Sequence, residues 1–98
     1  MNMQAMVRQA QKLQKEMLNA KEEINKKEFT GSSAMVSVKM NGKKELLEVK
    51  IDAETLGKDD IEMLQDMFVV AVNESMQKID KETEEKMGKY TQGMPGLF

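Results

Sequence analysis

Residues 3–26 are predicted to form one long helix, and this segment constrains the fold more than any other. Apolar side chains recur along it at alternating spacings of three and four residues, the pattern of a heptad seam. The seam consists of Met3, Met6, Ala10, Leu13, Met17, Ala20 and Ile24. No Gly or Pro interrupts the segment, and most of its residues favour helix. Such a seam needs a partner helix, in the same chain or in another copy.

The same helix carries a basic stripe on its other side. Arg8, Lys12 and Lys15 follow one another at spacings of four and three residues, which places them about 200° around the helix from the seam. Two interpretations are open for this stripe. It is either a solvated face that keeps the helix in water or a row of cations that contacts phosphates.

The residues after this helix predict a three-stranded antiparallel sheet. A short strand is expected over residues 29–33, with a bend at Gly31. Two further strands follow from alternating apolar residues, and Asn41-Gly42 between them is typical of a two-residue type I′ turn. The alternating residues are Val36, Val38 and Met40 in one strand and Leu47, Val49 and Ile51 in the next. One apolar face of the sheet therefore needs a covering layer, which a second helix supplies.

The second helix is expected to begin near Asp59, because Glu62 follows three residues later as in a capping box. Residues 67–72 are apolar on every side of this helix, so the sheet and a second copy of the chain would both be needed to bury them. The predicted dimer interface comprises Met67, Phe68, Val69, Val70 and Val72. Gly88 is a possible break, and residues 92–98 read as a loose tail. The pattern predicts a single α+β domain spanning residues 1–98.

Composition excludes most enzyme classes. The chain has neither His nor Cys, so the commonest general base, metal ligand and activated nucleophile are all missing. We expect no catalytic site, no cofactor and no small-molecule substrate. Four acidic residues near the second helix, Asp59, Asp60, Glu62 and Asp66, are explained by the positive helix start, so we expect no metal. No segment resembles a membrane span or a signal peptide, which predicts a cytoplasmic protein.

Charge is unevenly distributed along the chain. Residues 1–51 hold ten Lys/Arg against six Asp/Glu, a net charge of +4, whereas residues 52–98 hold five against eleven, a net charge of −6. A surface that binds a polyanion is therefore expected mainly in the first half. The candidate residues for such a surface are Arg8, Lys12, Lys15, Lys86 and Lys89, although Lys86 and Lys89 are equally well explained by compensation of the dipole at the helix end. Four lysines on or beside the hairpin, Lys39, Lys43, Lys44 and Lys50, either contribute to that surface or only protect the strand edge.

Several pieces of the chain, in their order and spacing, resemble the YbaB/EbfC family of bacterial nucleoid-associated proteins. They are the heptad-bearing first helix, Phe29-Thr30-Gly31-Ser32, Val36-Ser37-Val38, Asn41-Gly42, Val49-Lys50-Ile51-Asp52, the segment Asp60-Ile61-Glu62-Met63-Leu64-Gln65-Asp66, Met87-Gly88-Lys89 and the Gly/Pro-containing tail. The resemblance covers nearly the whole chain.

This resemblance implies an α+β homodimer shaped like tweezers, located in the nucleoid. Its projecting helices would contact double-stranded DNA with little sequence specificity, and it would have no catalytic site. The alternative from the residues alone is a coiled-coil adaptor that binds another protein through the seam and never touches DNA.

Overall fold

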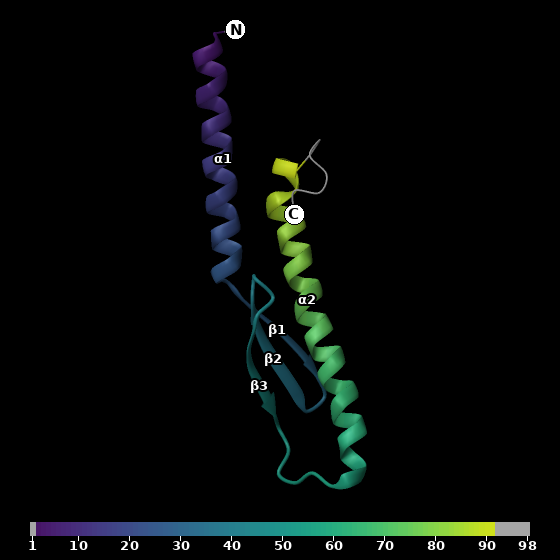
Figure 1. The fold of residues 1–98 in the computed structure, drawn as a ribbon. Helices are drawn as coiled ribbons and strands as arrows, with labels where there is room; N and C mark the ends of the chain where they lie inside the picture. Colours follow the sequence, from purple (N-terminus) through teal and green to yellow (C-terminus); the bar gives the residue numbers. More distant parts are fainter. Residues whose placement is uncertain (1, 92–98) are drawn as a thin grey trace.

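Two long helices and a small sheet form an elongated molecule of 71 × 21 × 14 Å. The computed structural model describes residues 2–91. Its elements in chain order are α1 (Met3–Lys26), β1 (Glu28–Ser33), β2 (Val36–Asn41), β3 (Leu46–Ile51), a short 3-10 helix η1 (Lys58–Asp60) and α2 (Ile61–Thr91) (Figure 1). The predicted α+β order is confirmed, and the first helix has the predicted bounds.

The sheet is antiparallel in the order β1-β2-β3, and α2 covers only part of it. α2 packs on β1 and β2 but does not reach β3. Val36, Val38 and Met40 of β2 are therefore buried. On β3, Val49 pairs with Val38 and Ile51 with Val36, so they face the same way, yet they remain 41% and 44% exposed. The expectation that the second helix covers the whole apolar face is wrong for β3.

Gly31 lies where β1 and α2 make their closest approach. It continues the strand instead of bending it, which corrects the sequence interpretation. A Cβ at this position would lie 2.0 Å from the carbonyl oxygen of Ala71 on α2. Ser75, one helical turn later, is fully buried and donates its hydroxyl to the carbonyl of Val72, 3.1 Å away. Glycine is required here because only a bare backbone allows this helix to pack so closely.

The hairpin between β2 and β3 differs from the predicted two-residue turn. The amide of Lys44 donates to the carbonyl of Asn41 at 3.0 Å, and Lys44 has a φ of 65°. This is the pattern of a three-residue loop, a turn closed by a residue in the left-handed region. A bulge follows, so that Leu46 rather than Leu47 occupies the position opposite Met40.

The start and the end of α2 also differ from expectation. The turn that precedes the helix is closed by Asp60, whose Oδ2 accepts the amide of Gly57 at 2.9 Å, and not by Asp59 with Glu62. At the other end the helix continues through Gly88 without a break. The predicted loose tail, residues 92–98, lies outside the described residues.

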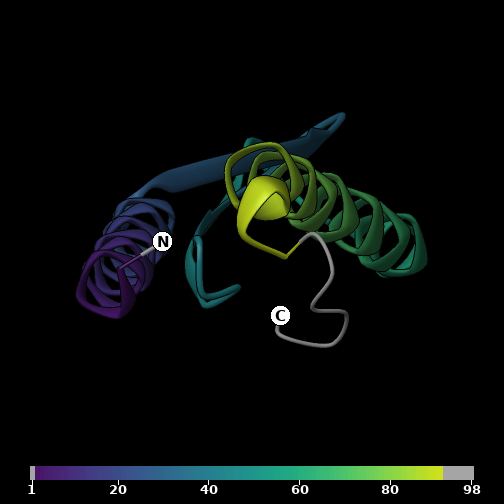
Figure 2. The ribbon, with the colours of Figure 1, turned by 90° about the horizontal axis from the view of Figure 1, so that it is seen from above.

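The last third of α1 packs against α2 and the sheet, and this contact fixes the direction of the whole helix. Ile24 is 3% exposed in a cluster with Phe29, Met40, Ile79 and Met87. Met17 and Ala20 pack against the edge of the same cluster. In the view from above, both helices lie on the same side of β1 (Figure 2). The second half of the seam therefore meets α2 of its own chain.

Gly42 of the hairpin also contacts the packed part of α1, residues 17–26, which we call the α1 root. A Cβ there would lie 2.0 Å from the carbonyl oxygen of Ile24, so the loop and the helix end touch through their backbones. Lys27, just past the helix, forms an ion pair with Glu82 of α2. The α1 root is therefore held by apolar packing, by a backbone contact and by the Lys27–Glu82 ion pair, which we call the charged brace.

Candidate nucleic-acid interface

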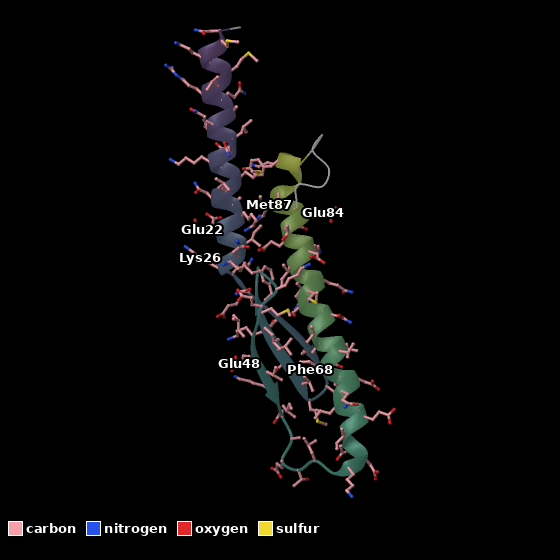
Figure 3. All side chains as sticks on the ribbon, viewed as in Figure 1. Glu22, Lys26, Glu48, Phe68, Glu84 and Met87 are labelled. Carbon is pink, nitrogen blue, oxygen red and sulfur yellow. The ribbon has the colours of Figure 1, made fainter. Side chains whose placement is uncertain are left out.

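The first half of α1 projects from the rest of the molecule. All of residues 3–15 are exposed, including Met3, Met6 and Leu13 of the seam, at 80%, 52% and 50%. We call residues 3–15 the α1 tip. At about 1.5 Å per residue the tip is about 20 Å long, and this part of the helix projects past the other described elements (Figure 3). Asn2 caps it, because its Oδ1 accepts the amide of Gln4 at 2.9 Å.

The structure brings the three cations of the basic stripe together on this tip. Arg8, Lys12 and Lys15 are all exposed, and within residues 2–91 none of them forms an ion pair. Residues 2–15 contain no Asp or Glu, and the first carboxylate along the chain is Glu16. The tip thus carries three positive charges and no acidic residue of its own.

Lys86 and Lys89 lie on the last described turns of α2, which end alongside the middle of α1 (Figure 1). Both are exposed. The Nζ of Lys89 is 4.9 Å from the centre of the Tyr90 ring, a cation–π arrangement that leaves the charge accessible. The two lysines therefore lie at the same end of the molecule as the basic stripe, but on a different helix and beside the acidic Glu84 and Glu85.

The hairpin lysines are engaged with acidic residues, with one exception. Lys39 has its Nζ 3.5 Å from Glu28 and 3.4 Å from Glu48. The charge of Glu28 and the hydrogen bond to Glu48 raise the pKa of Lys39 above its usual value. Lys44 pairs with Asp80 at 2.8 Å and Lys50 with Glu48 at 3.7 Å. Lys43 is the exception, with no ion pair to any residue of the 2–91 range. The hairpin is thus less suited than the α1 tip to neutralise phosphates.

The predicted dimer interface divides into two sets of side chains. Met67, Phe68 and Val72 pack in their own chain against Val36, Val38 and Ala71, as Figure 3 shows for Phe68. Val69 and Val70 are 55% and 53% exposed. The sequence did not single out the uncovered pair on β3, Val49 and Ile51, because strand alternation gives the face of a residue and not the width of the covering helix.

Other site types find no support in the part of the chain that the structure describes. Its acidic side chains form no group of three or more that could hold a metal ion. No helix in residues 2–91 has the length and apolar character that a bilayer crossing requires. The geometry therefore contributes a positively charged surface, the α1 tip, and exposed apolar side chains on β3 and on α2.

Comparisons with known proteins match nearly the whole chain. The model of the YbaB/EbfC DNA-binding family matches residues 1–94. A nucleoid-associated protein of Ligilactobacillus salivarius is 46% identical, covering 99% of this chain and 95% of the relative. One from Enterococcus faecalis is 44% identical, with coverages of 98% and 94%. The crystal structure of an uncharacterized protein from Helicobacter pylori shares the fold, with a TM-score of 0.74 at 24% identity over 92% of this chain and 97% of the other. This chain belongs to the YbaB/EbfC DNA-binding family.

Proposed function

We propose that this protein binds double-stranded DNA in the bacterial nucleoid, largely without sequence specificity and without catalysing a reaction. One observation carries the proposal: the α1 tip presents Arg8, Lys12 and Lys15 on a rigid projecting helix with no acid among them. The family description and the names of the relatives, nucleoid-associated proteins, support the same function.

The chemistry of the tip suits phosphates better than bases. Long cationic side chains on a rigid rod contact the regularly spaced phosphates of a duplex, and such contacts do not depend on sequence. Lys86 and Lys89 add charge at the same end of the molecule. Single-stranded binding is disfavoured because the chain has only three Phe and one Tyr for stacking on bases.

A homodimer forms the second part of the proposal. Val69 and Val70 on α2 and Val49 and Ile51 on β3 are large apolar side chains that their own chain leaves exposed. On the sheet, Val49 and Ile51 lie opposite the buried Val38 and Val36, so a second copy that covers β3 would extend the core of both chains. Two copies would present six cations of the basic stripe to DNA.

Reversal of the stripe tests the DNA site. The variant Arg8→Glu/Lys12→Glu/Lys15→Glu should abolish DNA binding while the protein stays folded and dimeric. Six neutralised phosphates per dimer also predict a slope of about −5 for log affinity against log salt, a loss of about 10³ between about 50 and 200 mM.

The matched control is Lys50→Glu/Lys58→Glu/Lys81→Glu, which changes net charge equally at exposed positions away from the tip. It should weaken DNA binding far less. If the stripe variant binds DNA like the wild type, or if wild-type affinity is flat against salt, the proposed site is wrong. Equal weakening by both variants would show an effect of total charge alone. A coiled-coil adaptor, the alternative function, predicts no DNA binding in any of these proteins.

The dimer has its own test in Val70→Asp. Because Val70 is 53% exposed in the single chain, the aspartate is compatible with the fold but would be buried without a partner charge in the dimer. Sedimentation should give twice the 11.2 kDa chain mass for the wild type and the single mass for the variant. Gln77→Asp, at an exposed position farther along α2, is the control. A wild type that sediments as one chain at micromolar concentration contradicts the dimer.

A further inference from the structure

The end of the molecule opposite the α1 tip combines exposed apolar side chains with negative charge. Leu56, Ile61 and Met63 are 46%, 52% and 43% exposed. Residues 52–66, which we call the acidic foot, hold six carboxylates and one lysine, a net charge of −5. The carboxylates are Asp52, Glu54, Asp59, Asp60, Glu62 and Asp66, and none forms an ion pair with any residue in the 2–91 range.

The α1 tip has the complementary chemistry. Met3, Gln4, Val7 and Arg8 form an open, exposed surface near the start of the tip. Val7 is 51% exposed, and the tip has a net charge of +3. A surface that pairs apolar side chains with a guanidinium matches a segment that pairs apolar side chains with carboxylates. The start of α2, Asp59-Asp60-Ile61-Glu62-Met63, is such a segment.

We propose that the acidic foot of one molecule docks on the α1 tip of another. Tip and foot lie at opposite ends of a molecule 71 Å long, so they cannot meet within one chain (Figure 1). Charge decides the occupant of the tip: a second tip would set +3 against +3, whereas the foot opposes +3 with −5. Because each contact leaves another tip and foot free, the association is heterologous and forms open chains of molecules.

This contact competes with DNA, a consequence that rests on the proposed function. Both the foot and a DNA phosphate would use Arg8 and Lys12, so a tip occupied by a foot cannot bind DNA. Self-association at high protein concentration would reduce DNA binding, and added DNA would dissociate the assemblies of molecules. The acidic foot of one molecule thus competes with DNA for the α1 tip of another, and its affinity for the tip falls as salt rises.

Sedimentation velocity of the full-length protein against concentration, at about 50 and 300 mM salt, tests the contact without DNA. The wild type should form assemblies larger than the proposed dimer at low salt, and these should dissociate to the dimer at high salt. Asp59→Lys/Glu62→Lys on the foot, or Arg8→Glu/Lys12→Glu on the tip, should each weaken association at least about tenfold, and the two reversals combined in one chain should restore it. Glu84→Lys/Glu85→Lys, with the same charge change elsewhere on α2, should leave it unaltered.

Three outcomes overturn the proposal: no growth of the wild type at low salt, growth that survives reversal of the foot, or no rescue in the combined variant. The milder Asp59→Asn/Glu62→Gln keeps the test valid if lysines disturb the start of α2, and circular dichroism checks the fold of each variant. The foot variants should retain DNA binding. If Arg8→Glu/Lys12→Glu loses self-association but keeps DNA binding, the proposed DNA site fails and the contact between copies stands.

Discussion

The two halves of α1 carry the same heptad pattern in opposite surroundings. In the root half, Met17, Ala20 and Ile24 pack against α2 and the hairpin. In the tip half, Met3, Met6 and Leu13 are at least half exposed, because no other described element extends beside them (Figure 1). A heptad pattern therefore predicts which side of a helix can be buried. Which residues on that side are buried depends on how far the partner helix extends.

The comparison also explains how the tip remains helical. A free helix of about 13 residues is marginal in water because the first turn is costly to form. The root supplies that first turn, since packing already fixes residues 17–26 as helix, and the tip only has to propagate it. Its Gln, Ala, Met, Leu and Lys residues favour propagation. The tip is thus a helical extension that is stable because the root already forms the first helical turns.

The largest difference between the halves should appear when one seam residue in each is truncated. Ile24→Ala removes a side chain that is 3% exposed and leaves a cavity, which should cost about 3 kcal/mol of unfolding free energy. Leu13→Ala removes one that is 50% exposed and should change that free energy by less than about 0.5 kcal/mol. Urea denaturation followed by circular dichroism measures both, and equal losses would mean that the tip is buried in solution.

The charged brace at the root should have a smaller effect. Glu82 is only 18% exposed and accepts a hydrogen bond from Lys27, so Glu82→Gln should cost about 1 kcal/mol. Glu22→Gln is the matched control, because Glu22 pairs with Lys26 at 2.9 Å on the surface, where its side chain is 62% exposed, and should cost at most a few tenths of a kcal/mol. A double-mutant cycle with Lys27→Met separates the pair from other effects. No coupling in the cycle would show that the brace contributes nothing.

Periodicity predicted the elements well because it is a local property of the chain. The bounds of α1, the buried face of β2 and the α-β-β-β-α order all follow from spacings of three, four and two residues. The errors concern geometry between elements. Leu47 was displaced by a bulge, and Val49 stayed exposed because α2 crosses only two strands. No local pattern encodes the path of a helix across a sheet.

Glycines and charges show the same limit. Gly31 suggested a bend that β1 does not have, whereas Gly42 does lie in the hairpin loop. Neither pattern indicated that each glycine allows a backbone contact with a helix. For the candidate site, the sequence predicted the basic stripe of Arg8, Lys12 and Lys15. It could not separate these cations from the hairpin lysines, because most of the acidic partners of Lys39, Lys44 and Lys50 come from other strands or from α2.

The smallest effect on global stability is expected at the far end of the tip, from Asn2→Ala. Its side-chain cap on Gln4 is worth about 1 kcal/mol of local helix stability, but the tip makes few contacts through which this loss could reach the core. Hydrogen exchange at the amides of residues 5–10 should accelerate about fivefold, while the free energy of global unfolding stays within about 0.3 kcal/mol of the wild type.

Asn19→Ala, at an exposed position beside the root, is the control and should leave exchange in residues 5–10 unchanged. If Asn2→Ala lowers global stability by the full value of the cap, the tip does not fray on its own and must be packed against something in solution. Repeating the hydrogen-exchange measurement at low and high salt then identifies the kind of surface that packs on the tip. Protection of the tip that disappears at high salt points to the acidic foot of another copy, whereas protection that persists points to apolar contacts.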